Sequence, residues 1–204
     1  VLLTISNHPP YIIPPYFKPT RERLEEQIVE YADWSIRQFM TEVARQPWFE
    51  NTIFVLLGDH GKLVGTPECE SPQSYNHIPL MIYGKDIKPG KIDKFCGQID
   101  LAPTLLSLLN ISYTQNNFGI NLFKEERPCM FFTADNLIGA RDSSGVYIYI
   151  PDSQQELKYE ITDKGLTAAE DNVKFQTLKE YCFSMLQCAE HMVSNQQTVD
   201  SKSE

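Results

Sequence analysis

Three short runs of apolar residues restrict the folds open to this chain more than any other feature of its sequence. They are "VLLTIS" at Val1–Ser6, "TIFVLL" at Thr52–Leu57 and "IPLMIYG" at Ile78–Gly84. None alternates apolar with polar residues, which indicates strands that are buried on both faces. Between the first two runs, apolar residues recur at helical spacing from Thr20 to Gln46, which predicts an amphipathic helix with Thr20 as its N-cap. This strand–helix–strand order predicts an α/β fold, with a mostly parallel sheet flanked by helices.

The second half of the chain has a different pattern. A short helix is expected to begin near Asp100, and the segments "CMFFTAD", "GVYIYIP" and "QELKYEITD" predict strands separated by short turns. We expect these strands to form a small antiparallel addition toward the C-terminus. A final helix is predicted over Ala168–Met192, with Val173, Leu178 and Cys182 on its inner side. Residues 1–193 are expected to form one domain, and the polar tail over residues 194–204 is expected to be disordered.

Composition excludes several classes of function. The chain has 204 residues, a net charge of -9 and a pI near 5.0, which argues against a nucleic-acid partner because such a partner requires a clustered basic face. No apolar run reaches the length of about 18 residues that a membrane span needs. The five cysteines contain no CxxC pair, so neither a zinc ribbon nor a thioredoxin-type site is indicated.

The apolar run at Thr52–Leu57 ends abruptly in Gly58-Asp59-His60-Gly61. In open α/β sheets, ligands bind beyond the carboxyl ends of the strands, which is where Asp59 and His60 are expected to lie. An anionic oxygen and a neutral imidazole nitrogen suit Zn²⁺, Mn²⁺ or another borderline divalent ion. A polar turn explains the same four residues equally well, and two ligands do not complete a site.

Three of the four histidines lie at predicted strand boundaries. His8 follows the first apolar run and His77 precedes the third, whereas His191 lies on the final helix and is interpreted as a surface residue. A single histidine in a loop is usually solvated rather than a ligand, so the argument depends on their shared placement. Asp100 is interpreted as a helix N-cap in preference to a site residue.

Together these segments resemble a known family. "TISNHPPY", "NTIFVLLGDHG", "PLMIYG", "GQIDLAPTLLSLLNI" and "FGINLF" resemble, in this order, the C-terminal half of the catalytic domain of the sulfatase-like phosphoglycerol transferases. This lipoteichoic acid synthase-like family belongs to the alkaline phosphatase superfamily. The resemblance runs from about Val1 to Phe123 and implies an alkaline phosphatase/sulfatase-like α/β fold, of which residues 1–193 would be the C-terminal portion.

The resemblance also implies roles for individual residues. Asp59 and His60 would bind one divalent metal ion, Mn²⁺, Mg²⁺ or Zn²⁺. His8 would face the phosphate or head-group of the substrate, and His77 would contact the substrate or a second metal ion. The implied reaction is attack by a metal-activated Thr on a phosphodiester, which gives a phospho-enzyme adduct that is passed to an acceptor alcohol or to water.

In this family the nucleophilic Thr and an acidic metal ligand precede the segment that the chain resembles. We therefore expect no catalytic nucleophile in this chain, no activity from the chain alone, and the N-terminal half of the same protein as its partner. The substrate would be a phosphodiester-bearing lipid or glycan, handled outside the cytoplasm by a membrane-anchored parent protein. Two alternatives stay open. One is a true sulfatase, whose Cys/Ser-x-Pro-x-Arg motif this chain lacks; the other is a non-catalytic domain that kept the fold.

Overall fold

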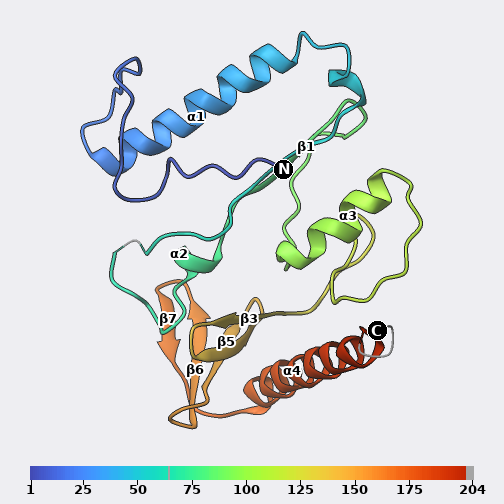
Figure 1. Ribbon diagram of the computed structural model, residues 1–204. Coiled ribbons are helices and arrows are strands. Elements are labelled where there is room, and N and C mark those ends of the chain that lie inside the picture. The colour runs from blue at the N-terminus through green and yellow to red at the C-terminus, as the bar shows by residue number, and fades with distance from the viewer. Residues whose placement is uncertain (64, 201–204) are drawn as a thin grey trace. The chain divides into compact units, whose positions relative to one another are not determined.

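The computed structural model describes residues 1–63 and 65–200, with side chains as far as Ser194. The chain forms two compact units, and Figure 1 labels most of their helices and strands. The first unit comprises Val1–Leu57 and Leu80–Lys88, and the second comprises Gly58–Pro79 and the chain from Pro89 onward. The second unit therefore contains both the Asp59-His60 segment and His77, whereas His8 belongs to the first.

The first unit contains one long helix, α1, and a two-stranded sheet. Its elements are α1 (Leu24–Val43), a 3₁₀ turn (Phe49–Asn51), β1 (Phe54–Leu57) and β2 (Leu80–Tyr83). The expected N-cap, Thr20, is wrong: Arg23 holds that position, without a side-chain cap. Thr20 instead donates from its hydroxyl to Oε1 of Glu30 at 2.6 Å and from its amide to Oε2 at 2.9 Å, so its side chain ties the incoming loop to the middle of α1.

The prediction of a mostly parallel sheet is wrong for the described residues. β1 and β2 pair antiparallel, with Phe54 opposite Tyr83, and the larger sheet is antiparallel too. A parallel pair needs a crossover that carries the chain back to the starting end of the sheet, usually on a helix. The segment between β1 and β2 contains only the four-residue helix α2 (Gln73–Asn76), and the chain returns directly alongside β1.

The first apolar run does not form a strand. Residues 1–5 have no ladder partner in the described part of the chain, and Val1, Leu2, Leu3 and Ile5 are each at least 80% exposed. An apolar run becomes a strand only when a neighbour accepts its backbone hydrogen bonds. The sequence pattern therefore identified a segment suited to burial, which is a different property from being paired.

The second unit is built on a five-stranded antiparallel meander in the order β3-β4-β5-β6-β7 (Figure 1). Its strands and long helix are β3 (Met130–Ala134), β4 (Leu137–Arg141), β5 (Gly145–Ile150), β6 (Gln155–Thr162), β7 (Gly165–Ala168) and α4 (Val173–Asp200). The predicted antiparallel addition is thus present but larger than expected, because β4 and β7 were missed.

Both faces of this meander are covered. On one face α4 packs its fully buried Phe175, with Leu178 and Cys182, against Ala140 and Tyr147 of the sheet. Val173, expected on the inner side of this helix, is the first residue of α4 and is 84% exposed, whereas Phe175, two residues later, is fully buried. Of the tail expected to be disordered, residues 194–200 continue α4, and residues 201–204 lie outside the described part of the chain.

The opposite face of the meander is covered by the loop that follows the Asp59-His60 segment. Val146 and Ile148 form a buried cluster there with Cys69 of this loop. The Tyr159 hydroxyl also donates to Oε2 of Glu70 at 2.6 Å. The sheet thus fixes the far end of the loop that joins Gly61 to α2.

A short helical pair, a 3₁₀ turn (Gln98–Asp100) followed by α3 (Leu101–Leu108), completes the second unit. Asp100 occupies the expected N-cap position of α3, but its side chain does not cap the helix. Its fully buried carboxylate accepts hydrogen bonds from the Gly97 and Ile120 amides, each at 2.8 Å, and pairs with buried Arg127. Asp100 therefore joins three separate segments.

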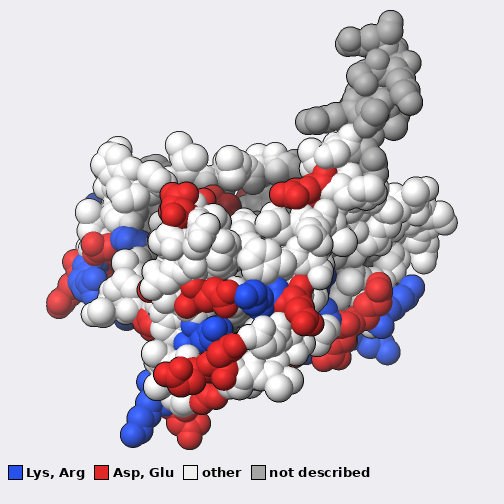
Figure 2. Space-filling model, turned by 90° about the horizontal axis from the view of Figure 1, so that it is seen from below, with Lys and Arg blue, Asp and Glu red and all other residues white. Residues whose placement is uncertain are grey.

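The surface is charged and mixed. Figure 2 shows acidic and basic side chains interspersed on one face. Within the second unit, Glu156 of β6 pairs with Lys179 of α4, and Glu160 pairs with Lys174 at 3.3 Å. No helix within residues 1–63 and 65–200 combines the length and the hydrophobicity that a bilayer crossing needs.

Candidate functional site

Asp59 and His60 lie two and three residues beyond β1, on an exposed turn. Oδ1 of Asp59 accepts a hydrogen bond from the His60 amide at 2.9 Å, so the carboxylate folds back over the following residue. Oδ2 of Asp59 then lies 3.8 Å from Nε2 of His60. The side chains are 73% and 58% exposed, and the turn therefore presents a carboxylate oxygen and an imidazole nitrogen side by side to solvent.

The histidine ring is held in one tautomer. Nδ1 of His60 lies 2.7 Å from the Gly61 carbonyl oxygen, and because a carbonyl can only accept, Nδ1 carries the proton. In the neutral ring Nε2 then keeps its lone pair, and this nitrogen lies on the side of Asp59. Metal-binding histidines commonly donate their other ring N–H to a backbone carbonyl in this way.

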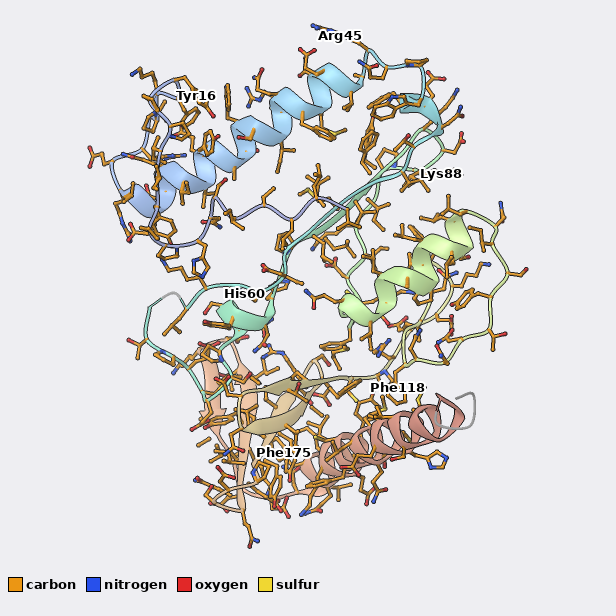
Figure 3. The ribbon with its side chains drawn as sticks, in the orientation of Figure 1. Tyr16, Arg45, His60, Lys88, Phe118 and Phe175 are labelled. Carbon is orange, nitrogen blue, oxygen red and sulfur yellow. The ribbon has the colours of Figure 1, made fainter. Side chains whose placement is uncertain are left out.

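Helix α2 fixes the turn from one side. The Gly61 amide donates to the Tyr75 carbonyl at 2.8 Å, and the His60 ring stacks on the Tyr75 ring with centroids 5.9 Å apart and planes at 13°. His60 lies beside α2 in Figure 3. A Cβ at position 61 would lie 2.0 Å from the Ser74 carbonyl oxygen, so only glycine permits this approach.

Gln98 fixes the turn through its backbone. Nε2 of the Gln98 side chain donates to the backbone carbonyl of Gly58 at 3.0 Å and to that of Asp59 at 2.7 Å. Sequence reasoning missed this residue, which lies almost 40 positions away in the "GQID" segment before α3. The only signal was a polar residue after a glycine at the start of a helix, and that pattern does not specify a partner.

His77 lies in the same unit but makes no three-ligand cluster with Asp59 and His60. It follows α2 directly, is exposed, and donates its amide to the Gln73 carbonyl at 2.8 Å. No group of three or more His, Cys, Asp or Glu side chains suited to a metal ion occurs within the described residues. His77 therefore stays a predicted substrate residue.

His8 lies in the first unit, on an exposed turn, where its Nδ1 is 2.9 Å from the Pro9 carbonyl oxygen. Because it belongs to the other unit, its position relative to Asp59 stays a prediction. Of the four expected site residues, the structure brings only Asp59 and His60 together.

The donor chemistry of this pair fits a divalent cation. Metal–ligand bonds to carboxylate oxygen and imidazole nitrogen are about 2.0–2.2 Å long, so two ligand atoms of one ion lie at most about 4.4 Å apart. The observed 3.8 Å between Oδ2 and Nε2 is within that limit. Ordinary coordination needs at least four ligands, so further ligands would come from outside this pair.

Comparison with known proteins defines the class first and then the family. A solved structure, a protein of the alkaline phosphatase superfamily from Vibrio parahaemolyticus, matches with a TM-score of 0.80 and 23% identity, over 94% of this chain and 48% of that one. The chain thus has an alkaline phosphatase superfamily fold. The sulfatase family model matches residues 1–111, more than half of the 204 residues. The chain therefore belongs to the sulfatase family.

The curated relatives include enzymes named for lipoteichoic acid synthesis. Lipoteichoic acid synthase 2 of Bacillus subtilis is 29% identical over 156 residues, which are 68% of this chain and 24% of the relative. Lipoteichoic acid synthase of Staphylococcus saprophyticus is 29% identical over 135 residues, 54% of this chain and 20% of the relative. The resemblance stated from the sequence is confirmed, and the chain spans about a quarter or less of the length of these relatives.

Proposed function

We propose that this chain is the C-terminal part of the catalytic domain of a metal-dependent phosphoglycerol transferase or hydrolase. The observation that carries the proposal is the paired Oδ2 of Asp59 and Nε2 of His60, 3.8 Å apart, with the imidazole fixed by the Gly61 carbonyl. Similarity to proteins named lipoteichoic acid synthases supports a phosphodiester head-group as the substrate.

Each part of the turn has a definite task in this proposal. Asp59 supplies an anionic oxygen, and His60 supplies a neutral nitrogen whose tautomer is set by Gly61. Gln98 holds the backbone at Asp59, and stacking on Tyr75 restricts rotation of the imidazole. A divalent ion bound there would lower the pKa of an attacking hydroxyl and neutralise charge on the transferring phosphoryl group.

The proposal extends beyond the described residues. The nucleophile and the remaining metal ligands would come from the N-terminal half of the same protein, and His8 and His77 would contact the phosphodiester substrate. A membrane-anchored parent protein would carry out the reaction outside the cytoplasm. On this basis the chain alone would be catalytically inactive.

Substitution of the paired ligands in the longer protein tests the proposal. Asp59→Asn and His60→Gln keep the size of each side chain, and each should lower phosphodiester turnover by more than about 100-fold, because loss of residues that merely orient metal ligands already costs 10–100-fold. Asp33→Asn is the matched control, since this exposed carboxylate pairs with Arg37 on α1. Unchanged turnover in either ligand variant would contradict the proposal.

A sulfatase is the second candidate, because the family model that matches this chain is the sulfatase model. The two candidates differ in the bond that is cleaved. We expect the longer protein to turn over a phosphoglycerol-bearing lipid and to leave an aryl sulfate ester intact. The reverse preference would favour sulfuric ester hydrolysis with a metal ion bound by the same two ligands, Asp59 and His60.

A further inference from the structure

A polar pocket of about 530 Å³ lies at the C-terminal end of α3. Its volume is within the range of about 300–1,000 Å³ that is typical of small-molecule sites. Side chains that line it include Ser107, Asn110, Ser112, Tyr113, Asn121 and Lys124. It is shallow and open, and all of its residues belong to the second unit.

The pocket is held by the polar groups of its own wall. The Asn110 amide donates to the Ser107 carbonyl at 3.1 Å, and the positive φ of 53° at Asn110 ends α3. On the facing segment, the Leu122 amide donates to Oγ1 of Thr104 at 3.1 Å. The two sides are thus tied through the helix, so the pocket exists before any ligand arrives.

Asn121 places a hydrogen-bond donor of fixed orientation in this wall. Only 7% of Asn121 is exposed, and its Oδ1 accepts from the Phe123 amide at 3.0 Å, which fixes the orientation of the side-chain amide. Its Nδ2 donates no hydrogen bond to any side chain or carbonyl in the described chain. This NH₂ group is therefore available to donate to a ligand hydroxyl or ether oxygen.

The rest of the lining indicates the chemistry of the ligand. Ser107 and Ser112 contribute hydroxyls, and Tyr113 offers an aromatic ring that is 40% exposed. Lys124 and Glu125 are adjacent in sequence and carry opposite charges. Oε1 of Glu125 accepts a hydrogen bond from the backbone amide of Asn121 at 3.0 Å. Balanced charge disfavours an anion, and a polar wall disfavours an acyl chain.

We propose that this pocket binds a neutral polyhydroxylated unit, such as a sugar residue or a polyol. The Asn121 side-chain amide and the serine hydroxyls would bond its hydroxyls, and Tyr113 would pack on its apolar face. The pocket lies at the opposite end of α3 from Gln98, which holds the Asp59 turn, so it is a separate site. The inference goes beyond the proposed function and does not depend on metal binding.

Titration of the ¹⁵N-labelled full chain tests the inference by nuclear magnetic resonance, with a neutral disaccharide and glycerol as probes. Up to about 10 mM, ten times a dissociation constant of about 1 mM, the disaccharide should shift the Asn121 side-chain amide signals and the Ser112 and Tyr113 backbone signals. Glycerol 3-phosphate should bind no more tightly than glycerol. Absence of shifts at these residues, or tighter binding of the phosphate ester, would overturn the inference.

Matched variants separate ligand binding from folding. Asn121→Asp keeps the oxygen that accepts from Phe123 but replaces the donor, and it should weaken disaccharide binding about tenfold. Tyr113→Ala should weaken it to a similar extent, whereas Tyr113→Phe, which keeps the ring, should leave it within about twofold. Equal binding by Tyr113→Ala and Tyr113→Phe would contradict the role of the ring. Asp59→Asn should leave binding unchanged, and a loss there would show that the two sites are not separate.

Discussion

Replacement of Asp100 by Asn tests the internal connection on which the second unit depends. The Asp100 side chain is completely buried, and Arg127, its partner, is 7% exposed. Its two oxygens accept from the Gly97 amide, the Ile120 amide and the Arg127 guanidinium. An Asn side chain would face one of these donors with its own NH₂ group in either orientation, and it would leave the guanidinium charge without a counter-ion.

The expected cost follows from that geometry. Removal of one partner from a buried ion pair lowers stability by about 3–5 kcal/mol, because the remaining charge stays desolvated. For a chain of this length, 1 kcal/mol corresponds to about 2–4 °C in Tm, so the expected fall is roughly 6–20 °C. The loss should be smaller in Asp100→Asn/Arg127→Met, since the double variant removes both charges.

Urea unfolding followed by far-ultraviolet circular dichroism measures this change in stability. The matched control is Asp93→Asn: Asp93 pairs with Lys91 at 2.6 Å, but the two side chains are 73% and 81% exposed. An exposed pair contributes about 0.5 kcal/mol, so the control should lose little stability. A loss below about 1 kcal/mol in Asp100→Asn, comparable with that of the control, would refute the reasoning.

Three further outcomes are expected. Gly61→Ala should weaken metal binding at the adjacent turn, because its Cβ would collide with a carbonyl of α2; metal titration checks this. The hydrogen bond from Lys179 lowers the pKa of Glu156. The pair should therefore stabilise the fold by about 0.5–1 kcal/mol above the unfolded pKa of about 4.3, and this stabilisation should be lost as the pH falls through the folded pKa. The difference in stability between the original chain and Lys179→Met, followed against pH, measures the contribution. Burial raises the pKa of the Cys129 and Cys182 thiols to about 11, so both should resist alkylation at pH 8 in the folded chain, as mass spectrometry can show.

Two of these outcomes have a control in the same chain. Gly90→Ala should be neutral for metal binding, because a Cβ there meets no atom within 4 Å. Cys188 is an exposed thiol and should alkylate first. Unchanged metal affinity in Gly61→Ala would contradict the argument about the turn. An effect of Lys179→Met that does not depend on pH would contradict the argument about Glu156. Equal labelling of all cysteines would contradict the argument about burial.

The sequence predicted the presence of most elements but not their pairing. Apolar runs correctly located β1 and β2, and helical periodicity located α1 to within a few residues. Strand direction depends on the path of the connecting segment, which contains only α2, and no local pattern encodes that path. β4 was missed because "LIGAR" is short and contains glycine. The structure requires that glycine, because a Cβ added at position 139 would lie 2.7 Å from the Tyr147 carbonyl oxygen.

The two candidate ligands could be predicted from the sequence, but the residues that hold their turn in place could not. Asp59 and His60 are adjacent in sequence, so local pattern and family resemblance sufficed to select them. Gln98 and Tyr75 reach the turn through tertiary contacts, and their partners follow only from the folded chain. Asp100 shows the same limit, because its helix-start position concealed a buried pair with Arg127 that lies 27 residues away.

Metal binding at Asp59 and His60 is the central claim, and titration of the chain with Zn²⁺ tests it most directly through the imidazole ¹⁵N signals of its four histidines. The proposed arrangement predicts weak binding in which the Nε2 signal of His60 shifts while its Nδ1 stays protonated and hydrogen-bonded to Gly61. The shift should be lost in Asp59→Asn and kept in the exposed control Asp33→Asn. An unchanged His60 signal, or an equal shift in Asp59→Asn, would contradict the metal assignment.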